Sequence, residues 1–393
     1  MTRAWFGRAA ETLMDPALHP TRPKEGMTWD ATIDAAVRAY LDARYERAES
    51  LLLVALETAK DFGPTNPRIS TSLRTLGIVY EAMGQYAEAE RLFRQALDIL
   101  DQAKARESLD GAAALANLGG IYFVLGRYTE AETTAGIAVG VYDNMNGEGE
   151  VNYAKALDVC ADVAMLRGLY SIAGRYIRRS TAVRQRTVGQ THLTMAQSHT
   201  RAAELLTLEG QLAQAAYHLE QALSIRQRAC RGEHPLIAQS LNALGRLQQL
   251  QGRAREAVAL HREALLIQVK SLGPRHADRA TTLELLAKAT VAIGELGEAE
   301  PLAEEALGIL QHRLGPDHLG VADALFTLAE LRARQARWAE ARTHCREALS
   351  ITTRVLGARH PRIAAHLDEY SAILRSAGQV HAETATPTSG SPA

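Results

Sequence analysis

The hydrophobic and polar positions of this chain repeat with a period of 42 residues. A motif that reads Gly-Gln-Tyr-Ala-Glu-Ala-Glu at 84–90 returns as Gly-Arg-Tyr-Thr-Glu-Ala-Glu at 126–132. The first residue of the motif keeps this spacing along the chain, apart from one step of 41 residues. It is found at Ala43, Gly84, Gly126, Gly168, Gly210, Gly252, Gly294, Ala336 and Gly378. Such self-similarity predicts an array of repeated helical units.

Before this glycine, a leucine, a small residue and an apolar residue follow one another at spacings of four and two. In the second copy they are Leu73, Gly77 and Val79, and His199 is the one residue that breaks the leucine series. These spacings place a single apolar stripe on a helix.

After the glycine, a second helix is predicted, with alanine at one position in every copy: Ala48, Ala89, Ala131, Ala173, Ala215, Ala257, Ala299 and Ala341. Such small side chains allow two helices to approach to about 8 Å, and glycine supplies the backbone angles of a tight turn. One helix pair cannot bury its apolar face alone, so the pairs must stack. The pattern predicts an all-α solenoid of about eight helix pairs plus a terminal helix.

The spacing of small and aromatic residues in each copy carries a family resemblance. In the second copy these residues are Leu76, Gly77, Tyr80, Gly84, Tyr86, Ala89, Phe93 and Ala96. They resemble the signature of the tetratricopeptide repeat. The 42-residue length and the junction Leu-Gly-Pro-x-His at 272–276 and 314–318 are similar to the kinesin-light-chain type. The resemblance implies a right-handed superhelix whose first helices line a concave groove.

The two ends of the chain differ from the array, which we expect to span residues 30–380. Residues 1–29 contain three prolines and are expected to form an N-terminal extension or cap. The small, polar residues 381–393 predict a disordered tail. No signal-peptide-like run occurs near the start, and the longest aliphatic stretch, 51–56, is too short to span a bilayer. We therefore expect a cytoplasmic protein.

Charge and cysteine content narrow the function further. The 44 basic and 45 acidic residues give a net charge of −1, so neither nucleic acid nor a membrane surface is an expected partner. The three cysteines form no CxxC pair. Of these, Cys160 and Cys345 fall on apolar repeat positions, where core packing is the expected role.

The recurring histidines are the most tempting candidates for chemistry: His192, His234, His276, His318 and His360. Equivalent positions in stacked repeats lie about 10 Å apart, whereas a zinc ion needs ligands at about 2 Å. We therefore predict that each histidine caps the helix that follows it, as Asn66 would. No HExxH or GxSxG motif is present. The sequence predicts neither catalysis nor a metal or cofactor site.

A polar stripe on the first helix of each pair is the predicted partner-binding groove, carried over by position from the resemblance. Its residues are Arg74, Asn117, Asp158, Asp162, Arg201, Glu204, Asn242, Arg246, Glu284, Lys288, Asp323 and Glu330. The wider stripe has more acids than bases, which favours a neutral or mildly basic peptide, and Phe123, Met165 and Phe326 interrupt it with apolar contacts. The alternative is that these polar residues only solvate the helices. The two-Lys, two-Asn clamp for acidic carboxy termini is absent from adjacent repeats.

Two functions remain open at this point. The first is a scaffold or adaptor that binds a protein or peptide in the groove. The second is a regulator that senses a peptide or other ligand and acts on a separately encoded effector, because no ATPase or DNA-binding module is visible in the sequence.

Overall fold

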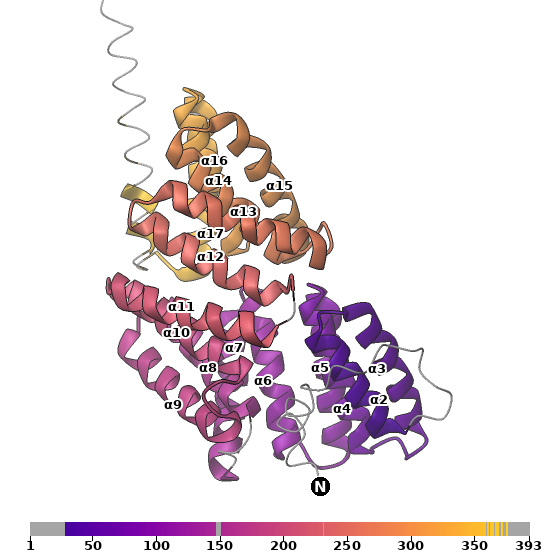
Figure 1. The fold of residues 1–393 in the computed structure, drawn as a ribbon. Coiled ribbons are helices and arrows are strands. Elements are labelled where there is room, and N and C mark those ends of the chain that lie inside the picture. The colour runs from indigo at the N-terminus through magenta and orange to yellow at the C-terminus, as the bar shows by residue number, and fades with distance from the viewer. Residues whose placement is uncertain are drawn as a thin grey trace, which may run out of the picture.

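The computed structural model describes residues 28–146, 151–230 and 232–358, together with 360, 362–364, 366–368, 371 and 375. Its helices are α2 (Trp29–Leu41), α3 (Tyr45–Lys60), α4 (Pro67–Ala82), α5 (Tyr86–Gln102), α6 (Leu109–Val124), α7 (Tyr128–Asn144), α8 (Val151–Leu166), α9 (Tyr170–Val188), α10 (Leu193–Leu208), α11 (Leu212–Ala229), α12 (Pro235–Leu250), α13 (Ala254–Ser271), α14 (Ala277–Ile293), α15 (Leu296–Leu314), α16 (Leu319–Arg334) and α17 (Trp338–Leu356). Consecutive helices form antiparallel pairs, and neighbouring pairs contact each other (Figure 1). The predicted all-α solenoid is confirmed.

The turn inside each pair has the backbone geometry that the glycine predicts. The φ angles of Gly84, Gly126 and Gly210 are +70°, +76° and +78°. Where the motif begins with alanine, the residue still takes a positive φ, 56° at Ala43 and 58° at Ala336. The backbone of this turn is therefore common to the copies, and glycine adopts it without a steric penalty.

The small residues mark the closest contacts between the two helices of a pair. The alanine that recurs on the second helix is fully buried in every copy, from Ala48 to Ala341. A methyl group on Gly77 would lie 2.6 Å from the Phe93 ring, and one on Gly245 would lie 2.5 Å from the His261 ring. Larger side chains at these positions would force the helices apart.

The first helices whose N-terminal cap is described begin at a side-chain cap. The Oδ1 atom of Asn66 accepts from the amide of Arg68, and the Nδ1 atoms of the junction histidines accept in the same way from the amide two residues later. The capping histidines are His192, His234, His276, His318 and His360. The predicted capping role is confirmed.

The junction histidines also join distant parts of the superhelix. Because Nδ1 is an acceptor, Nε2 carries the proton and donates to a carbonyl 194 residues away. His276 reaches Ala82 O at 3.0 Å, and His318 reaches Val124 O at 2.9 Å. His360 reaches Leu166 O in the same way. The solenoid therefore completes one superhelical turn in a little over four and a half repeats, and the repeats that follow pack against this first superhelical turn. Figure 1 shows α12–α17 stacked against the earlier helices.

Apolar contacts support the same inter-turn interface. Tyr86, at the start of α5, is buried in one cluster with Ala277, the first residue of α14, and Leu314 from the end of α15 packs against this cluster. A methyl group on Gly84 would lie 3.2 Å from the His276 ring, and one on Gly126 would lie 3.3 Å from the His318 ring. The two turns are therefore in van der Waals contact, not merely joined by hydrogen bonds.

The expected terminal regions fall almost entirely outside the described residues. The extension expected at 1–29 is described only from residue 28, and α2 begins at Trp29. The tail expected at 381–393 lies outside the description, whereas the described residues between 362 and 375 are helical, as expected of a terminal helix. Within the described part of the chain, every helix is too short or too polar to cross a bilayer.

Candidate partner-binding surface

The predicted groove residues of α4, α6 and α8 lie inside the molecule. Arg74, Asn117 and Asp158 are buried, and the whole segment from Gly111 to Tyr122 of α6 is buried as well. Lys155 on α8 crosses this region. Its Nζ donates to Asn117 Oδ1 at 2.8 Å and to Glu81 Oε2 at 3.1 Å. In this first superhelical turn, side chains of the polar stripe therefore bond to one another inside the protein.

A buried charge cluster connects α8, α9 and α10. Arg184 Nη1 donates to Asp158 Oδ1 at 3.2 Å and to Ser198 Oγ at 3.0 Å, and Nη2 also reaches Asp158. Arg201 lies 3.4 Å from Asp158 and donates to both oxygens of Asp162, at 3.0 and 2.9 Å. The structure therefore brings together three predicted groove residues, Asp158, Asp162 and Arg201. Their charged groups pair with one another.

The pKa values in this cluster follow from burial and pairing. Burial opposes ionisation of Asp158, but Arg201 and Arg184 outweigh it and lower the pKa of that carboxyl. Burial raises the pKa of Asp162 to about 6, even though Arg201 acts in the opposite direction. Asp158 is therefore held as a carboxylate, whereas burial makes the carboxyl of Asp162 harder to ionise.

Further along the chain, two more predicted residues are buried in polar contacts. Asn242 Nδ2 donates to Thr282 Oγ1 at 2.6 Å, and Asn242 Oδ1 lies 2.9 Å from His261 Nδ1. Glu284 Oε1 accepts from Thr327 at 2.8 Å, and burial raises the pKa of this carboxyl. These side chains link neighbouring first helices. They are not placed to meet a ligand on the surface.

The exposed part of the predicted groove is a row at one register position. We call Glu204, Arg246, Lys288 and Glu330 the first-helix row, because they occupy equivalent positions of α10, α12, α14 and α16. Glu204, Arg246 and Lys288 are exposed. Glu330 is half-buried and accepts from Arg334 at 2.9 Å. Among the described residues, no carboxylate forms an ion pair with Arg246 or Lys288.

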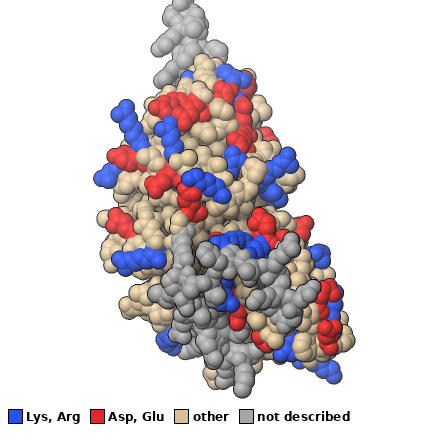
Figure 2. Space-filling model, turned by 45° about the vertical axis from the view of Figure 1, so that its right-hand side comes forward, with Lys and Arg blue, Asp and Glu red and all other residues tan. Residues whose placement is uncertain are grey.

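Ion pairs engage several acids of the predicted groove and of the wider stripe. Asp162 pairs with Arg201, Glu81 with Lys155, and Asp323 with Arg362. Phe326 is buried against His366, with 3.9 Å between ring centroids, whereas Phe123 and Met165 are half-buried. On the face drawn in Figure 2, basic and acidic side chains alternate without a large patch of one sign.

The family model described as tetratricopeptide repeat matches residues 35–102, 194–265, 236–312 and 320–382, which together exceed half of the chain. The chain belongs to the tetratricopeptide repeat family. The family prediction made from the motif is confirmed, and the 42-residue helix pairs of the fold are its repeats.

Two solved structures, both of Rap proteins, share this fold. A Rap protein complexed with competence and sporulation factor is 13% identical, with a TM-score of 0.66, and the match covers 90% of this chain and 95% of that one. The apo form of RapI is 15% identical, with a TM-score of 0.52 over 73% of this chain and 98% of that one. Repeats of a putative kinesin light chain from Podosopora anserina are 25% identical, with a TM-score of 0.40 over 51% of this chain and 94% of that one. A search of curated proteins found no match.

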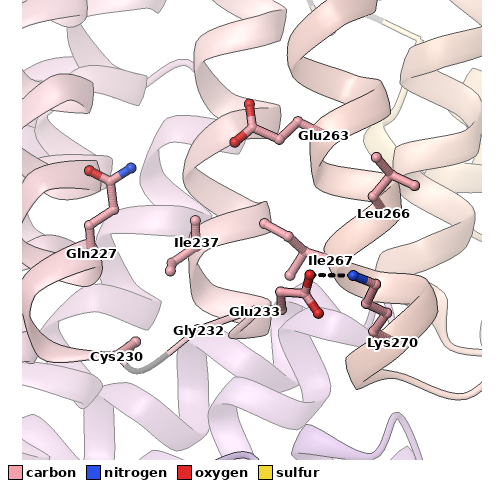
Figure 3. Close-up of a pocket in the computed structure, with 9 residues that line it drawn as sticks. All are labelled: Gln227, Cys230, Gly232, Glu233, Ile237, Glu263, Leu266, Ile267 and Lys270. Carbon is pink, nitrogen blue, oxygen red and sulfur yellow. Dashed lines mark hydrogen bonds and ion pairs between the residues drawn. The ribbon is translucent and has the colours of Figure 1, made fainter.

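A depression of about 440 Å³ lies among α11, α12 and α13 (Figure 3). Its lining residues are Gln227, Cys230, Gly232, Glu233, Ile237, Glu263, Leu266, Ile267 and Lys270. Lys270 and Glu233 form an ion pair across it, and Leu266 is strongly exposed. None of the predicted groove residues lines this depression.

Two buried arginines of the second helices escaped the sequence prediction, because only the first helices were searched for polar residues. Arg184 on α9 and Arg226 on α11 are 1% and 4% exposed, and they stand 42 residues apart at a core position. The signal was available in the sequence. An arginine on the apolar face of a helix needs a partner, and the equivalent positions in α5 and α15 carry Leu100 and Leu310.

Proposed function

We propose that the chain is a scaffold that binds a protein or peptide partner in the cytoplasm, without catalysis. The partner lies along the first-helix row of α10, α12 and α14. The observation that carries this proposal is a change along one register position: Asp162 of α8 is tied to Arg201, whereas Glu204, Arg246 and Lys288 of the following first helices are exposed. Successive repeats thus offer evenly spaced polar contacts, which suit an extended chain.

The charge of the partner stays a prediction. A neutral or mildly basic partner was expected from the acid excess of the stripe, but the exposed residues of the first-helix row are one acid, Glu204, and two bases, Arg246 and Lys288. Membership of the family supports a role in protein binding. The fold likeness to a Rap protein complexed with competence and sporulation factor is consistent with such a role.

A regulator that senses a ligand is the second function that an observation favours. Two helices that carry the first-helix row, α14 and α16, also contact the first superhelical turn. Their capping residues His276 and His318 bond to the carbonyls of Ala82 and Val124. A ligand that changes the curvature of α10–α14 would strain these contacts and change the overall shape. X-ray scattering with and without a bound peptide separates the two functions, because a plain scaffold keeps its radius of gyration.

A peptide array tests the binding surface directly. We compare the wild-type chain with Arg246→Glu/Lys288→Glu, and use Arg342→Glu/Arg346→Glu as a matched control. The control reverses the same number of charges on the exposed side of α17. The proposal expects the row variant to lose the peptides that the wild type binds and the control to keep them. Equal binding by all three proteins would place the partner elsewhere.

A further inference from the structure

Arg226 is a buried cation without a counter-charge. Only 4% of the residue is exposed, and its Nη1 atom donates to Ser240 Oγ at 2.7 Å. No carboxylate in the described part of the chain lies within ion-pair distance of this guanidinium. A buried charge is stabilised only when it is paired and hydrogen-bonded, so one half of this interaction is missing from the described part of the chain.

The preceding repeat shows what the missing half is. Arg184 occupies the same register position as Arg226, and it binds Asp158, Ser198 and Gln197. Moving each partner on by 42 residues gives Thr200, Ser240 and Gln239. The serine contact is reproduced at Arg226. The carboxylate is not, because Thr200 stands where Asp158 would be and its hydroxyl donates to Ala196 O at 2.9 Å.

Arg226 differs from Arg184 in the groups that surround it. The Nε atom of Arg184 is sealed from solvent without a partner, whereas no nitrogen of Arg226 is enclosed in this way. Glu204 and Arg201 on α10 are the charged groups that act on it, together with Cys230, and burial lowers its pKa to about 10. Glu204 and Gln239 are exposed. The guanidinium therefore lies beneath one end of the first-helix row.

We propose that Arg226, with Thr200 and Ser240, binds a carboxylate of the partner segment, in the place that Asp158 fills beside Arg184. This inference rests on the proposed function and names one chemical feature of the partner: an acidic side chain that enters between α10 and α12. Arg246 on α12 and Lys288 on α14 place two further positive charges along the row, where the rest of the partner segment lies.

Thr200→Asp tests the site because it supplies the carboxylate from within the chain, as the preceding repeat does. Thr200→Asn is the matched control, since it has nearly the same shape but no charge. Melting temperatures are measured in sodium acetate and in sodium chloride of equal ionic strength. We expect Thr200→Asp to melt higher than the wild type in chloride. We also expect acetate to raise the melting temperature of the wild type and of Thr200→Asn more than that of Thr200→Asp.

The same three proteins are then compared on the peptide array, with each acidic peptide paired with its Asn or Gln version. The wild type and Thr200→Asn should prefer the acidic versions by roughly tenfold or more, the range of a hydrogen-bonded charge pair, and Thr200→Asp should lose this preference. An equal acetate response in all three proteins, or an acidic preference that survives in Thr200→Asp, overturns the inference. Peptides that bind with no acidic preference overturn the inference and leave the proposed function standing. An acetate response without peptide binding supports the site and contradicts the proposed function.

Discussion

His318 and Val124 are joined by a hydrogen bond between two turns of one superhelix. The Nε2 atom of His318 lies 2.9 Å from the Val124 carbonyl oxygen, and its Nδ1 atom accepts from the amide of Gly320 at 3.0 Å. One imidazole therefore caps the N-terminus of α16 and also donates to the last carbonyl of α6. That carbonyl is available because the carbonyls of the last turn of a helix lack partners within that helix. Neutral histidine with its proton on Nε2 is the form that can make both contacts.

The two roles of His318 can be separated by substitution. His318→Asn should keep the cap, as Asn66 does at α4, but it is too short to reach Val124. His318→Ala should lose both contacts. We expect His318→Asn to cost about 1 kcal/mol and His318→Ala to cost about 1 kcal/mol more, measured by chemical denaturation. No loss in His318→Asn would mean that the inter-turn bond adds nothing, whereas equal losses for the two variants would mean that the cap adds nothing.

A pair of glycine substitutions tests the contact between the turns. Gly126 and Gly210 have nearly the same φ, +76° and +78°, but only Gly126 has the His318 ring 3.3 Å from the position of a Cβ atom. Gly210→Ala should cost about 1–2 kcal/mol from backbone strain alone. Gly126→Ala should lower the melting temperature further, because the His318 ring must move. If Gly210→Ala were the more damaging change, the turns would not be packed as described.

The caps predict a loss of stability in mild acid. Burial lowers the pKa of His318 against the opposing effect of Val124 O and Asp323, and burial also lowers the pKa values of His192 and His234. A histidine whose folded pKa is below its unfolded value of about 6.5 favours folding above that pH. Its contribution is therefore lost as the pH falls below about 6.5. Melting curves between pH 7.5 and 5.5 should show this decline, and His318→Asn should make it shallower. A pH dependence unaltered by His318→Asn would assign the decline to other groups.

Asp158 should be among the most sensitive positions of the chain. Its carboxylate balances buried Arg184 and also lies 3.4 Å from Arg201. Asp158→Asn removes the counter-charge but not the buried guanidinium, so we expect a loss of about 3–5 kcal/mol. Glu204→Gln, a comparable change at an exposed position of α10, should cost less than about 0.5 kcal/mol. Similar melting temperatures for the two variants would contradict the buried pairing.

The repeat unit could be predicted from sequence because the same local constraint recurs. Alanine at position 48 and its equivalents, glycine at the turn and histidine at the junction each report on contacts within a repeat or between neighbours. These contacts involve fewer than 42 residues, so one period contains all the information. Capping by the histidines was predicted on the same basis and is confirmed.

The inter-turn interface could not be predicted in this way, because it depends on how small rotations add up over several repeats. A signal was nevertheless present. The second helices of the first four repeats begin with tyrosine at positions 45, 86, 128 and 170, whereas the next three begin with Leu212, Ala254 and Leu296. The structure gives the reason at Tyr86, which is covered by α14 of the following turn.

Burial of five of the twelve predicted groove residues has a different cause. Asn117 and Asn242 occupy polar positions of first helices, and sequence alone cannot tell whether such a position faces a ligand or the next helix. Lys155 bridges two repeats to reach Glu81, and Thr282 meets Asn242 from the next helix. Only the assembled superhelix separates these internal contacts from the exposed first-helix row.

The closed two-turn superhelix is the claim on which the binding surface depends, and X-ray scattering measures it most directly. The variant with His276, His318 and His360 all changed to Asn should retain the helix caps, and its circular dichroism should match that of the wild type. Without the bonds to Ala82, Val124 and Leu166, its turns should separate and its radius of gyration should increase. A variant that keeps both its helix content and the radius of gyration of the wild type would contradict the account.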